Sequence, residues 1–353
     1  MVKHRQIHWP TLQCPAASTT CSEAAIKEQA ERKPPCQAVA KWLYLETIDI
    51  KLSSHSRRRS KALSSYLEIS RTISAAIREL LHTRLRDTGF LGETLHDRND
   101  LKSSHTVDDR ARTVVHDILA FYRCNVFVES FCTDTGKTAD FSIYVDPIDG
   151  SLNWDRGVGD PCVVITISDK PAATCLDDLI FGYVEGLRSG DIYYTRDHFA
   201  FMRSKIIGTE KQIQCSGPLR LPEATAYLRP GYSMAERQLK HTFPLFLLAR
   251  DIRAIDNAGM EFCEIARNAA DIMVEARNGS DFFNLLAYPI LKNAGGLLVD
   301  LNGDALGPQP IEIDKPYDYI ACNNRMLLDE ALNVMKRAAQ TRSYDHGNLR
   351  LLF

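Results

Sequence analysis

One stretch of ten residues, 145–154, constrains the fold of this chain more than any other. It follows an apolar, β-type run and combines two carboxylates with a proline, a glycine and a hydroxyl: Asp146, Pro147, Asp149, Gly150 and Ser151. Proline fixes φ and donates no hydrogen bond, and glycine permits a positive φ, so we expect a sharp turn after the strand. Two acids held that close repel each other unless a cation lies between them, and hard oxygen ligands suit Mg²⁺. An isolated stretch of this composition is equally typical of a surface turn, so the rest of the chain has to decide.

The overall composition is that of an ordinary globular protein and excludes several classes. The chain has 353 residues, of which 44% are hydrophobic and 25% are charged, and its formal net charge is −2. This length is enough for one large domain or two smaller ones. The nearly balanced charge provides no field that attracts nucleic acid or an acidic membrane, so we expect neither as a partner. No apolar run approaches the ~20 residues that a membrane-spanning helix needs.

Residues 1–60 differ from the rest of the chain. Prolines and Ser/Thr clusters interrupt any hydrophobic period there, so we expect a disordered N-terminal extension. Its first residues, with Lys3 and Arg5 and no acid before Glu23, resemble a transit peptide only weakly, because no amphipathic period accompanies them. The ten cysteines of the chain are scattered, without a Cys-x-x-Cys pair, and indicate free thiols in a reducing compartment, the cytoplasm.

The first half of the ordered chain, 61–220, reads as two helices followed by strands. A helical period runs from Ala62 to Gly89, and a second helix begins near Thr106, with Asp108 and Asp109 in its first turn, where the macrodipole favours acids. Short β-type runs separated by turn residues follow at 126–128, 141–145, 163–167, 179–184 and 192–195.

The second half, 221–353, alternates between the two types of element. We expect strands at 226–228, 253–255, 272–275, 297–300 and 319–322, and helices at 234–250, 260–268, 282–293 and 324–339. Alternation of this kind indicates an α/β fold in which helices cover the faces of sheets.

Three acids come at the carboxyl ends of strand-like runs in the first half. Glu129 ends the first run, and Asp146 and Asp149 end the second. Strand ends that face one crevice are where α/β sheets bind ligands. Carboxylates brought together there are typical of a divalent-metal site that activates water and stabilises the oxygens of a phosphoryl group. The residues by themselves therefore indicate a metal site that serves phosphate ester hydrolysis.

The same residues resemble a known family. The run Asp146-Pro147-Ile148-Asp149-Gly150-Ser151-Leu152-Asn153-Trp154 is similar to the Asp-Pro-Ile-Asp-Gly-Thr-x-Asn-Phe signature of the inositol monophosphatase superfamily, which includes fructose-1,6-bisphosphatases and bisphosphate nucleotidases. Further segments resemble the family in the same order, from residue 63 to 338: Glu129, 181–184, 270–275 and 294–300. The resemblance implies an αβαβα sandwich of layered helices and sheets, and a homodimer.

The resemblance also implies a role for each matching residue. Glu129, Asp146 and Asp149, with the carbonyl of Ile148, would hold Mg²⁺. Asp108 and Ser151 would orient the attacking water and take its proton, with help from Glu129. Asp149, Gly150 and Ser151 would bind the substrate phosphate, the last two through backbone N–H groups. Glu275 would contact substrate hydroxyls, although a strand-end acid at the surface is an equal alternative.

The chain departs from the family pattern at several positions, above all at the segment that supplies the family's last metal ligand. Where the family has the Trp-Asp pair that supplies its last metal ligand, this chain reads Asp281-Phe282-Phe283-Asn284. Asp281 is the nearest acid and could ligate metal, or it could simply cap a helix, while Asn284 is a weaker oxygen donor. Ser130 replaces a second Glu, and the segment Gly259-Met260-Glu261 replaces the family's Gly-Thr-Ala.

Two functions from different classes follow. The first is a Mg²⁺-dependent phosphomonoesterase for a small phosphorylated polyol or sugar, with inositol monophosphate as the first candidate and fructose bisphosphate or a bisphosphate nucleotide as alternatives. The second is a catalytically impaired relative that binds a phosphorylated ligand or a partner protein. The loss of the Trp-Asp pair favours the second function. The five retained groups Asp108, Glu129, Asp146, Asp149 and Ser151 favour the first.

Overall fold

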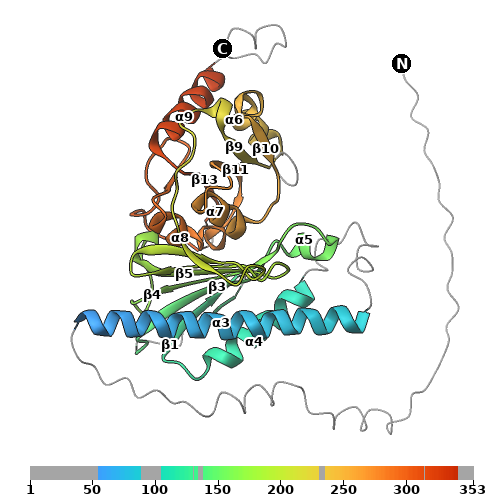
Figure 1. The fold of residues 1–353 in the computed structure, drawn as a ribbon, viewed down its shortest axis with the longest axis vertical. Coiled ribbons are helices and arrows are strands. Elements are labelled where there is room, and N and C mark those ends of the chain that lie inside the picture. The colour runs from blue at the N-terminus through green and yellow to red at the C-terminus, as the bar shows by residue number, and fades with distance from the viewer. Residues whose placement is uncertain are drawn as a thin grey trace, which may run out of the picture. The chain divides into compact units, whose positions relative to one another are not determined.

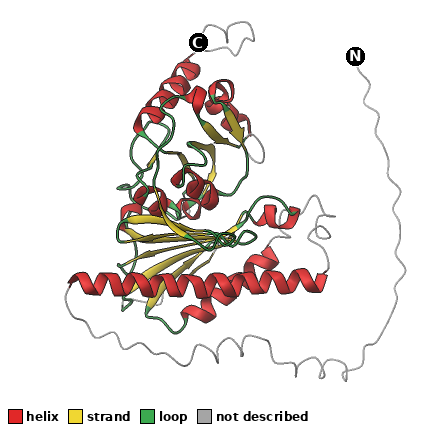
Figure 2. Cartoon of the chain, viewed as in Figure 1, coloured by secondary structure: helices red, strands yellow, loops and turns green. Residues whose placement is uncertain are grey.

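The computed structural model describes residues 55–88, 105–129, 131–133, 138–229, 235–313 and 315–340. The expected extension therefore lies, up to residue 54, outside the described residues, as does Ser130. The described residues, from 55 to 340, belong to one compact unit. Within it, layers alternate in the order helix, sheet, helix, sheet, helix (Figure 1, Figure 2).

The first sheet has eight strands in the order β2-β1-β3-β4-β5-β6-β7-β8. Strand β1 pairs in parallel with β3, and the other neighbours are antiparallel. The strands are β1 (Cys124–Val128), β2 (Phe131–Thr133), β3 (Phe141–Asp149), β4 (Cys162–Ser168), β5 (Leu179–Gly186), β6 (Ile192–Arg196), β7 (Phe199–Arg203) and β8 (Glu210–Ile213). The sequence missed β2, β7 and β8, which lie toward the two edges of the sheet. Their short or mixed polar runs lack a clear alternation.

Strand β3 is longer than the sequence predicted. The expectation of a sharp turn directly after Val145 was wrong, because the strand continues through Pro147 to Asp149. Its register against β4 shifts between Asp146 and Asp149, so this part of the strand is irregular. The turn comes one residue later, at Gly150, whose φ is 81°.

Two helices cover one face of this sheet. Helix α3 (His55–Thr88) packs on β4 and β5, and α4 (His105–Leu119) packs on β1 and β3. The apolar stripe of α3 supplies Ile73, Ile77 and Leu81, which are fully buried. The helix begins seven residues before the position expected from the hydrophobic period alone, at His55 instead of Ala62.

The second sheet has five strands in the order β10-β9-β11-β13-β12. They are β9 (Thr225–Leu228), β10 (Asp251–Arg253), β11 (Ile272–Ser280), β12 (Leu297–Val299) and β13 (Tyr317–Cys322). Helices α6 (Ala235–Leu248) and α9 (Arg325–Gln340) cover its outer face, with α6 on β9 and β11 and α9 on β13. The expected strand at 253–255 was misplaced by two residues.

A helical layer lies between the two sheets. Helix α7 (Ala258–Ala266) contacts β4 and β5 on one side and β11 and β13 on the other. Helix α8 (Tyr288–Asn293) contacts β5 to β7 and β12. The predicted continuous helix at 282–293 was wrong, because a 3₁₀ turn, η5 (Phe282–Leu285), precedes α8. Pro289 explains the break, since proline fits the first turn of a helix but not its interior.

The described cysteines whose side chains are placed carry free thiols: Cys124, Cys162, Cys175, Cys215, Cys263 and Cys322. Among the described helices, none is both long and apolar enough to cross a membrane.

Candidate active site

The end of β3 and the short helix α5 (Ser151–Arg156) form one wall of the candidate site. Gly150 is the N-cap of α5 and has a left-handed backbone. A Cβ at this position would lie 3.3 Å from Asn257 Nδ2. Glycine is therefore required here both for the positive φ and for the close approach of the loop to the second half of the chain.

Asp146 is a buried acid that the charges of three other carboxylates influence. Its side chain is 6% exposed, and its Oδ1 accepts a hydrogen bond from the Ile148 amide at 3.0 Å. Burial raises the pKa of Asp146 well above its usual range, and the charges of Glu129, Asp149 and Asp281 raise it further. The fold thus brings together three acids from β3 and the turn after β1, and adds Asp281 from the other half of the chain.

Asp149 contacts the second half of the chain through its carboxylate. Its Oδ2 accepts hydrogen bonds from the Gly259 amide and, at 3.8 Å, from the Cys162 thiol. A Cβ on Gly259 would lie 3.0 Å from this oxygen and 2.4 Å from a methyl group of Val164, so only glycine allows the contact. Burial raises the pKa of Asp149 to about 7, although the Gly259 hydrogen bond and the Arg229 charge lower it.

Ser151 begins α5 and lines the pocket described below. The first hydrogen bonds within α5 run from the amides of Asn153 and Trp154 to the Gly150 carbonyl. The amides of Ser151 and Leu152 precede these bonds and are first-turn donors, which a helix does not use internally.

Asn153 and Arg188 fix the position of α5. Asn153 Nδ2 donates to the carbonyls of Ile255 and Asp256 in the second half of the chain. The Arg188 guanidinium donates to the carbonyls of Asn153 and Trp154 and lies 5.5 Å from the centre of the Trp154 ring. The loop that carries the acids is therefore attached to both halves of the fold.

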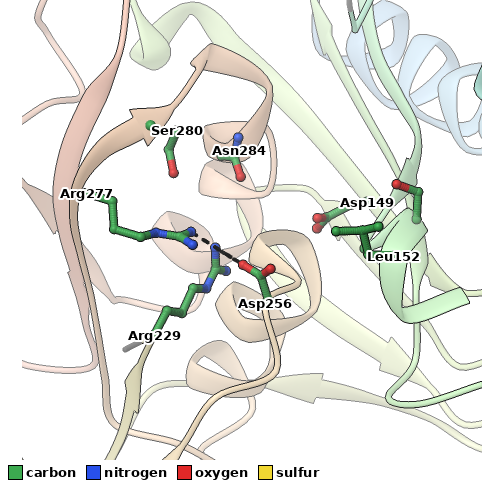
Figure 3. A pocket seen from close by; sticks show the side chains of 10 residues that line it. Asp149, Leu152, Arg229, Asp256, Arg277, Ser280 and Asn284 are labelled. Atoms are coloured by element: carbon green, nitrogen blue, oxygen red, sulfur yellow. Dashed lines mark hydrogen bonds and ion pairs between the residues drawn. The ribbon is translucent and has the colours of Figure 1, made fainter. Parts of the chain in front are cut away.

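A polar pocket of about 190 Å³ opens between the two walls (Figure 3). Asp149 and Leu152 lie on one side, and Arg229, Arg277 and Asp256 lie on the other. The full lining is Asp149, Gly150, Ser151, Leu152, Arg229, Asp256, Arg277, Gly279, Ser280 and Asn284.

Two nearly buried arginines and three acids form the second wall, which we call the arginine wall: Arg229, Arg277, Asp256, Glu261 and Glu275. The side chain of Arg229 is 5% exposed, and it pairs with Glu261 through Nη2 and with Asp256 at 3.2 Å through Nη1. Arg277 donates to Glu275 through Nε at 2.8 Å and Nη2 at 2.7 Å. Asp256 lies between the two guanidinium groups, 3.4 Å from Arg277 Nη2.

Glu275 lies at the back of the arginine wall and does not line the pocket. Its side chain is fully buried, and its oxygens accept hydrogen bonds from Arg277 and, at 3.5 Å, from Arg229. The alternative of an exposed strand-end acid was wrong. The two arginines that Glu275 holds, and not its own carboxylate, face the pocket.

The sequence reasoning missed Arg229, Asp256 and Arg277. Arg229 follows strand β9 directly, and Asp256 comes three residues after β10. A search for charged residues just after every strand in the second half, as in the first half, would have found these two. Arg277 lies within β11 and carried no such signal.

Asp281 caps η5, as the capping alternative predicted. Its Oδ1 accepts from the Phe283 amide at 2.9 Å and from Asn284 Nδ2 at 3.1 Å. Burial raises its pKa, while these hydrogen bonds lower it. Since its charge also acts on Asp146, Asp281 is a cap that lies near the carboxylate group. Asn284 lies beside it and lines the pocket.

The two remaining predicted residues lie in the first half. Glu129 follows β1, and its amide donates to the Val145 carbonyl at 3.1 Å, which places it beside the end of β3. Asp108 lies in the first turn of α4, a helix that packs on β1 and β3, and only its backbone is described.

Comparison with known proteins identifies the family. The sequence model of the inositol monophosphatase family matches residues 36–341, which is most of the chain. The chain belongs to the inositol monophosphatase family. Membership of this family identifies the protein as a phosphatase, that is, a phosphoric monoester hydrolase.

Two relatives of this chain are named for different activities. The fructose-1,6-bisphosphatase/inositol-1-monophosphatase of Archaeoglobus fulgidus is 25% identical over 276 residues, which cover 74% of this chain and 94% of that protein. The bifunctional NADP phosphatase/NAD kinase of Methanococcus maripaludis is 26% identical over 201 residues, which cover 53% of this chain and 34% of that protein.

Solved structures of the family confirm the predicted fold. An inositol monophosphatase from Zymomonas mobilis has a TM-score of 0.60 at 17% identity, over 78% of this chain and 99% of that one. The Thermotoga maritima IMPase has a TM-score of 0.61 at 18% identity, over 78% and 98%. The layered αβαβα sandwich expected from the sequence is therefore correct.

Members of the inositol monophosphatase family are in general metal-dependent, so we tested whether the residues fit Mg²⁺. The chemistry of the donors fits, because Asp146 and the three acids whose charges act on it, Glu129, Asp149 and Asp281, all offer hard carboxylate oxygens. Their arrangement fits less well. In the described part of the chain, no group of three or more His, Cys, Asp or Glu side chains could hold a metal ion as it stands.

The raised pKa values in this family member predict a pH-dependent stability of the metal-free protein. The folded-state pKa of Asp149, about 7, lies above its ordinary value of 3.8, so the folded state binds the proton more tightly than the unfolded state does. The resulting stabilisation is complete below about pH 4 and is lost as the pH rises through about 7. We expect the free energy of unfolding to fall between pH 5 and pH 8, by on the order of 1–3 kcal/mol from this group.

Denaturant unfolding of the chelator-treated protein between pH 5 and pH 8 measures the slope of the free energy of unfolding against pH. The Asp149→Asn variant keeps the shape and an acceptor for Gly259 but loses the titrating group, so its slope should be smaller. Equal slopes for the two proteins would contradict the assignment.

Proposed function

We propose that this protein is a Mg²⁺-dependent phosphomonoesterase that hydrolyses a small phosphorylated polyol, with inositol monophosphate as the first candidate. The observation that carries the proposal is a group of four carboxylates beside a polar pocket, Asp146 and the three acids whose charges act on it, Glu129, Asp149 and Asp281. Membership of the inositol monophosphatase family supports the reaction class.

Glu129, Asp146 and Asp149, with the Ile148 carbonyl, would hold Mg²⁺, and Asp281 would complete the set from the other half of the chain. When bound, Mg²⁺ supplies charge neutralisation at the phosphate and lowers the pKa of water. Four buried or half-buried acids close together need such a counter-charge, because burial and mutual repulsion both disfavour their ionised forms.

The protein groups would perform the remaining steps. The amides of Gly150 and Ser151 would bind the phosphate oxygens. Asp108 and Ser151, helped by Glu129, would orient the attacking water. As the water oxygen bonds to phosphorus and the ester P–O bond breaks, the water proton would pass to Asp108 and the leaving oxygen would take up a proton from solvent. The polyol would depart through the pocket between Leu152 and the arginine wall.

Fructose-1,6-bisphosphatase activity is the first alternative within the same chemistry, because the Archaeoglobus relative carries both names. A bisphosphate nucleotidase is the next. A function from another class is a catalytically impaired relative that binds a phosphorylated ligand or a partner. The arrangement of the acids favours that candidate, since no preformed three-ligand group exists among the described residues.

Phosphate release by the purified full-length protein tests the proposal. We expect release from inositol monophosphate in the presence of Mg²⁺ and its loss with a chelator. A panel of sugar, inositol and nucleotide phosphates should include the physiological class. If none of them is hydrolysed at any Mg²⁺ concentration while calorimetry still detects binding of a phosphorylated ligand, the binding function replaces the enzymatic one.

Two further inferences concern the oligomeric state of the protein and its cellular compartment. The family resemblance suggests a homodimer, and size-exclusion chromatography with light scattering measures it. The scattered thiols favour a reducing compartment, and we propose the cytoplasm on that ground.

A further inference from the structure

The arginine wall carries more negative than positive formal charge. Arg229 and Arg277 supply two positive charges, whereas Asp256, Glu261 and Glu275 supply three negative ones. Glu261 and Glu275 are fully buried and pair with the arginines from behind. The third acid, Asp256, lies at the pocket, and its side chain is 42% exposed. The excess negative charge is therefore on the side that a substrate meets (Figure 3).

Asp256 is held in this position by its backbone. Its φ is 62°, a left-handed conformation that residues other than glycine adopt rarely. Its amide donates to Glu261 Oε1 at 3.2 Å, and its carbonyl accepts from Asn153 Nδ2 at 3.3 Å. The loop that bears the metal-binding acids thus fixes the same residue that shields the arginines.

We propose that Asp256 is a specificity-determining residue that excludes a second anionic group from the pocket and so restricts the leaving group to uncharged polyols. This inference rests on the proposed function for the identity of the leaving group. Without Asp256, two guanidinium groups on the pocket wall would form a ready site for a second phosphate. With Asp256 between them, its Oδ1 occupies the donors that a phosphate would use, and the net charge repels a dianion.

The unused atoms of the same residues suit hydroxyl groups. Asp256 makes both of its arginine contacts through Oδ1, which leaves Oδ2 as an acceptor. Arg277 uses Nε and Nη2, and within the described residues its Nη1 makes no hydrogen bond. A carboxylate acceptor beside a guanidinium donor matches two neighbouring hydroxyls, each of which can donate and accept. The wall therefore accepts a polyol and rejects a bisphosphate.

The test compares two ligands and two proteins. Calorimetry without Mg²⁺, where no turnover occurs, gives the dissociation constants of inositol 1-phosphate and fructose 1,6-bisphosphate. We expect the wild-type protein to prefer the monophosphate and Asp256→Asn to shift the ratio of the two constants toward the bisphosphate by about tenfold or more. Asparagine is chosen because it tolerates the left-handed backbone as aspartate does. With Mg²⁺, the ratio of kcat/KM values should shift in the same direction.

The matched control is Asp197→Asn. Asp197 also has a left-handed backbone, with φ of 49°, but it is exposed in the turn between β6 and β7 and does not line the pocket. It should leave the ratio unchanged. An unchanged ratio in Asp256→Asn, with a thermal transition like that of the control, overturns the inference. If the binding ratio shifts but neither ligand is hydrolysed, the proposed enzymatic function fails while the role of Asp256 stands.

Discussion

Replacing Asp146 with asparagine is expected to lower kcat for phosphate release by about a thousandfold, while the fold persists. The substitution keeps the shape of the side chain but removes the central charge of the carboxylate group, and loss of one electrostatic stabiliser at such a site costs about 10²–10³ in kcat. The thermal transition of the metal-free variant should be no lower than that of the wild type, because neutralising Asp146 relieves repulsion from Glu129, Asp149 and Asp281. Steady-state kinetics and circular dichroism measure the two effects.

A second substitution separates the two roles of Asp281. Asparagine caps helices about as well as aspartate, so Asp281→Asn retains the hydrogen bond to the Phe283 amide but loses the charge near Asp146. If Asp281 ligates metal, this variant loses activity and needs more Mg²⁺ at an unchanged melting temperature. Wild-type activity in Asp281→Asn would restrict the residue to its capping role, and wild-type Mg²⁺ dependence in Asp146→Asn would place the metal elsewhere.

The largest effect on stability is expected from Arg229→Met. Arg229 is almost fully buried and pairs with the fully buried Glu261, so its removal leaves a carboxylate without a counter-charge in the interior. Breaking a buried pair in this way costs about 3–5 kcal/mol of the free energy of unfolding. Denaturant unfolding monitored by fluorescence measures the change.

A double variant and an exposed pair serve as controls for this prediction. Arg229→Met with Glu261→Gln removes both charges, and glutamine keeps an acceptor for the Asp256 amide, so much of the lost stability should return. Arg253→Met breaks the exposed pair with Asp251 and should change the free energy of unfolding far less, because solvent screens an exposed pair. A loss in Arg229→Met as small as that in Arg253→Met would show that the buried pair contributes little.

Local patterns predicted much of the fold because the central elements bury one face. Strands β4, β5 and β6 and helix α9 appear within about two residues of their expected ends, since long apolar runs or a clear helical period mark them. Short strands at the sheet edges, such as β2 and β8, contain neither a long apolar run nor a clear period. The break between η5 and α8 was missed because the apolar residues on either side of Pro289 continue one hydrophobic run.

Some residues of the candidate site could likewise be predicted from local patterns, and others could not. Asp146 and Asp149 belong to one continuous motif, and Glu129 follows β1, the strand that pairs with β3, so local patterns were enough to predict that these three acids lie near one another. The arginine wall comes from the ends of β9 and β10, from α7 and from β11, which are far apart along the chain. Which charges pair there depends on distances that no sequence pattern specifies.

The sequence by itself determined the layered α/β architecture and the family, and it pointed to the acids Glu129, Asp146 and Asp149 as site residues, because local hydrophobic periods mark the elements and these acids come at the ends of strand-like runs. Only the tertiary structure decided that Glu275 lies behind two arginines, that Asp281 caps a turn beside Asp146, and that Asp256 faces the pocket. The physical reason is that burial and charge pairing depend on contacts between segments distant in the sequence. Those contacts form only when the two sheets pack on the helical layer between them.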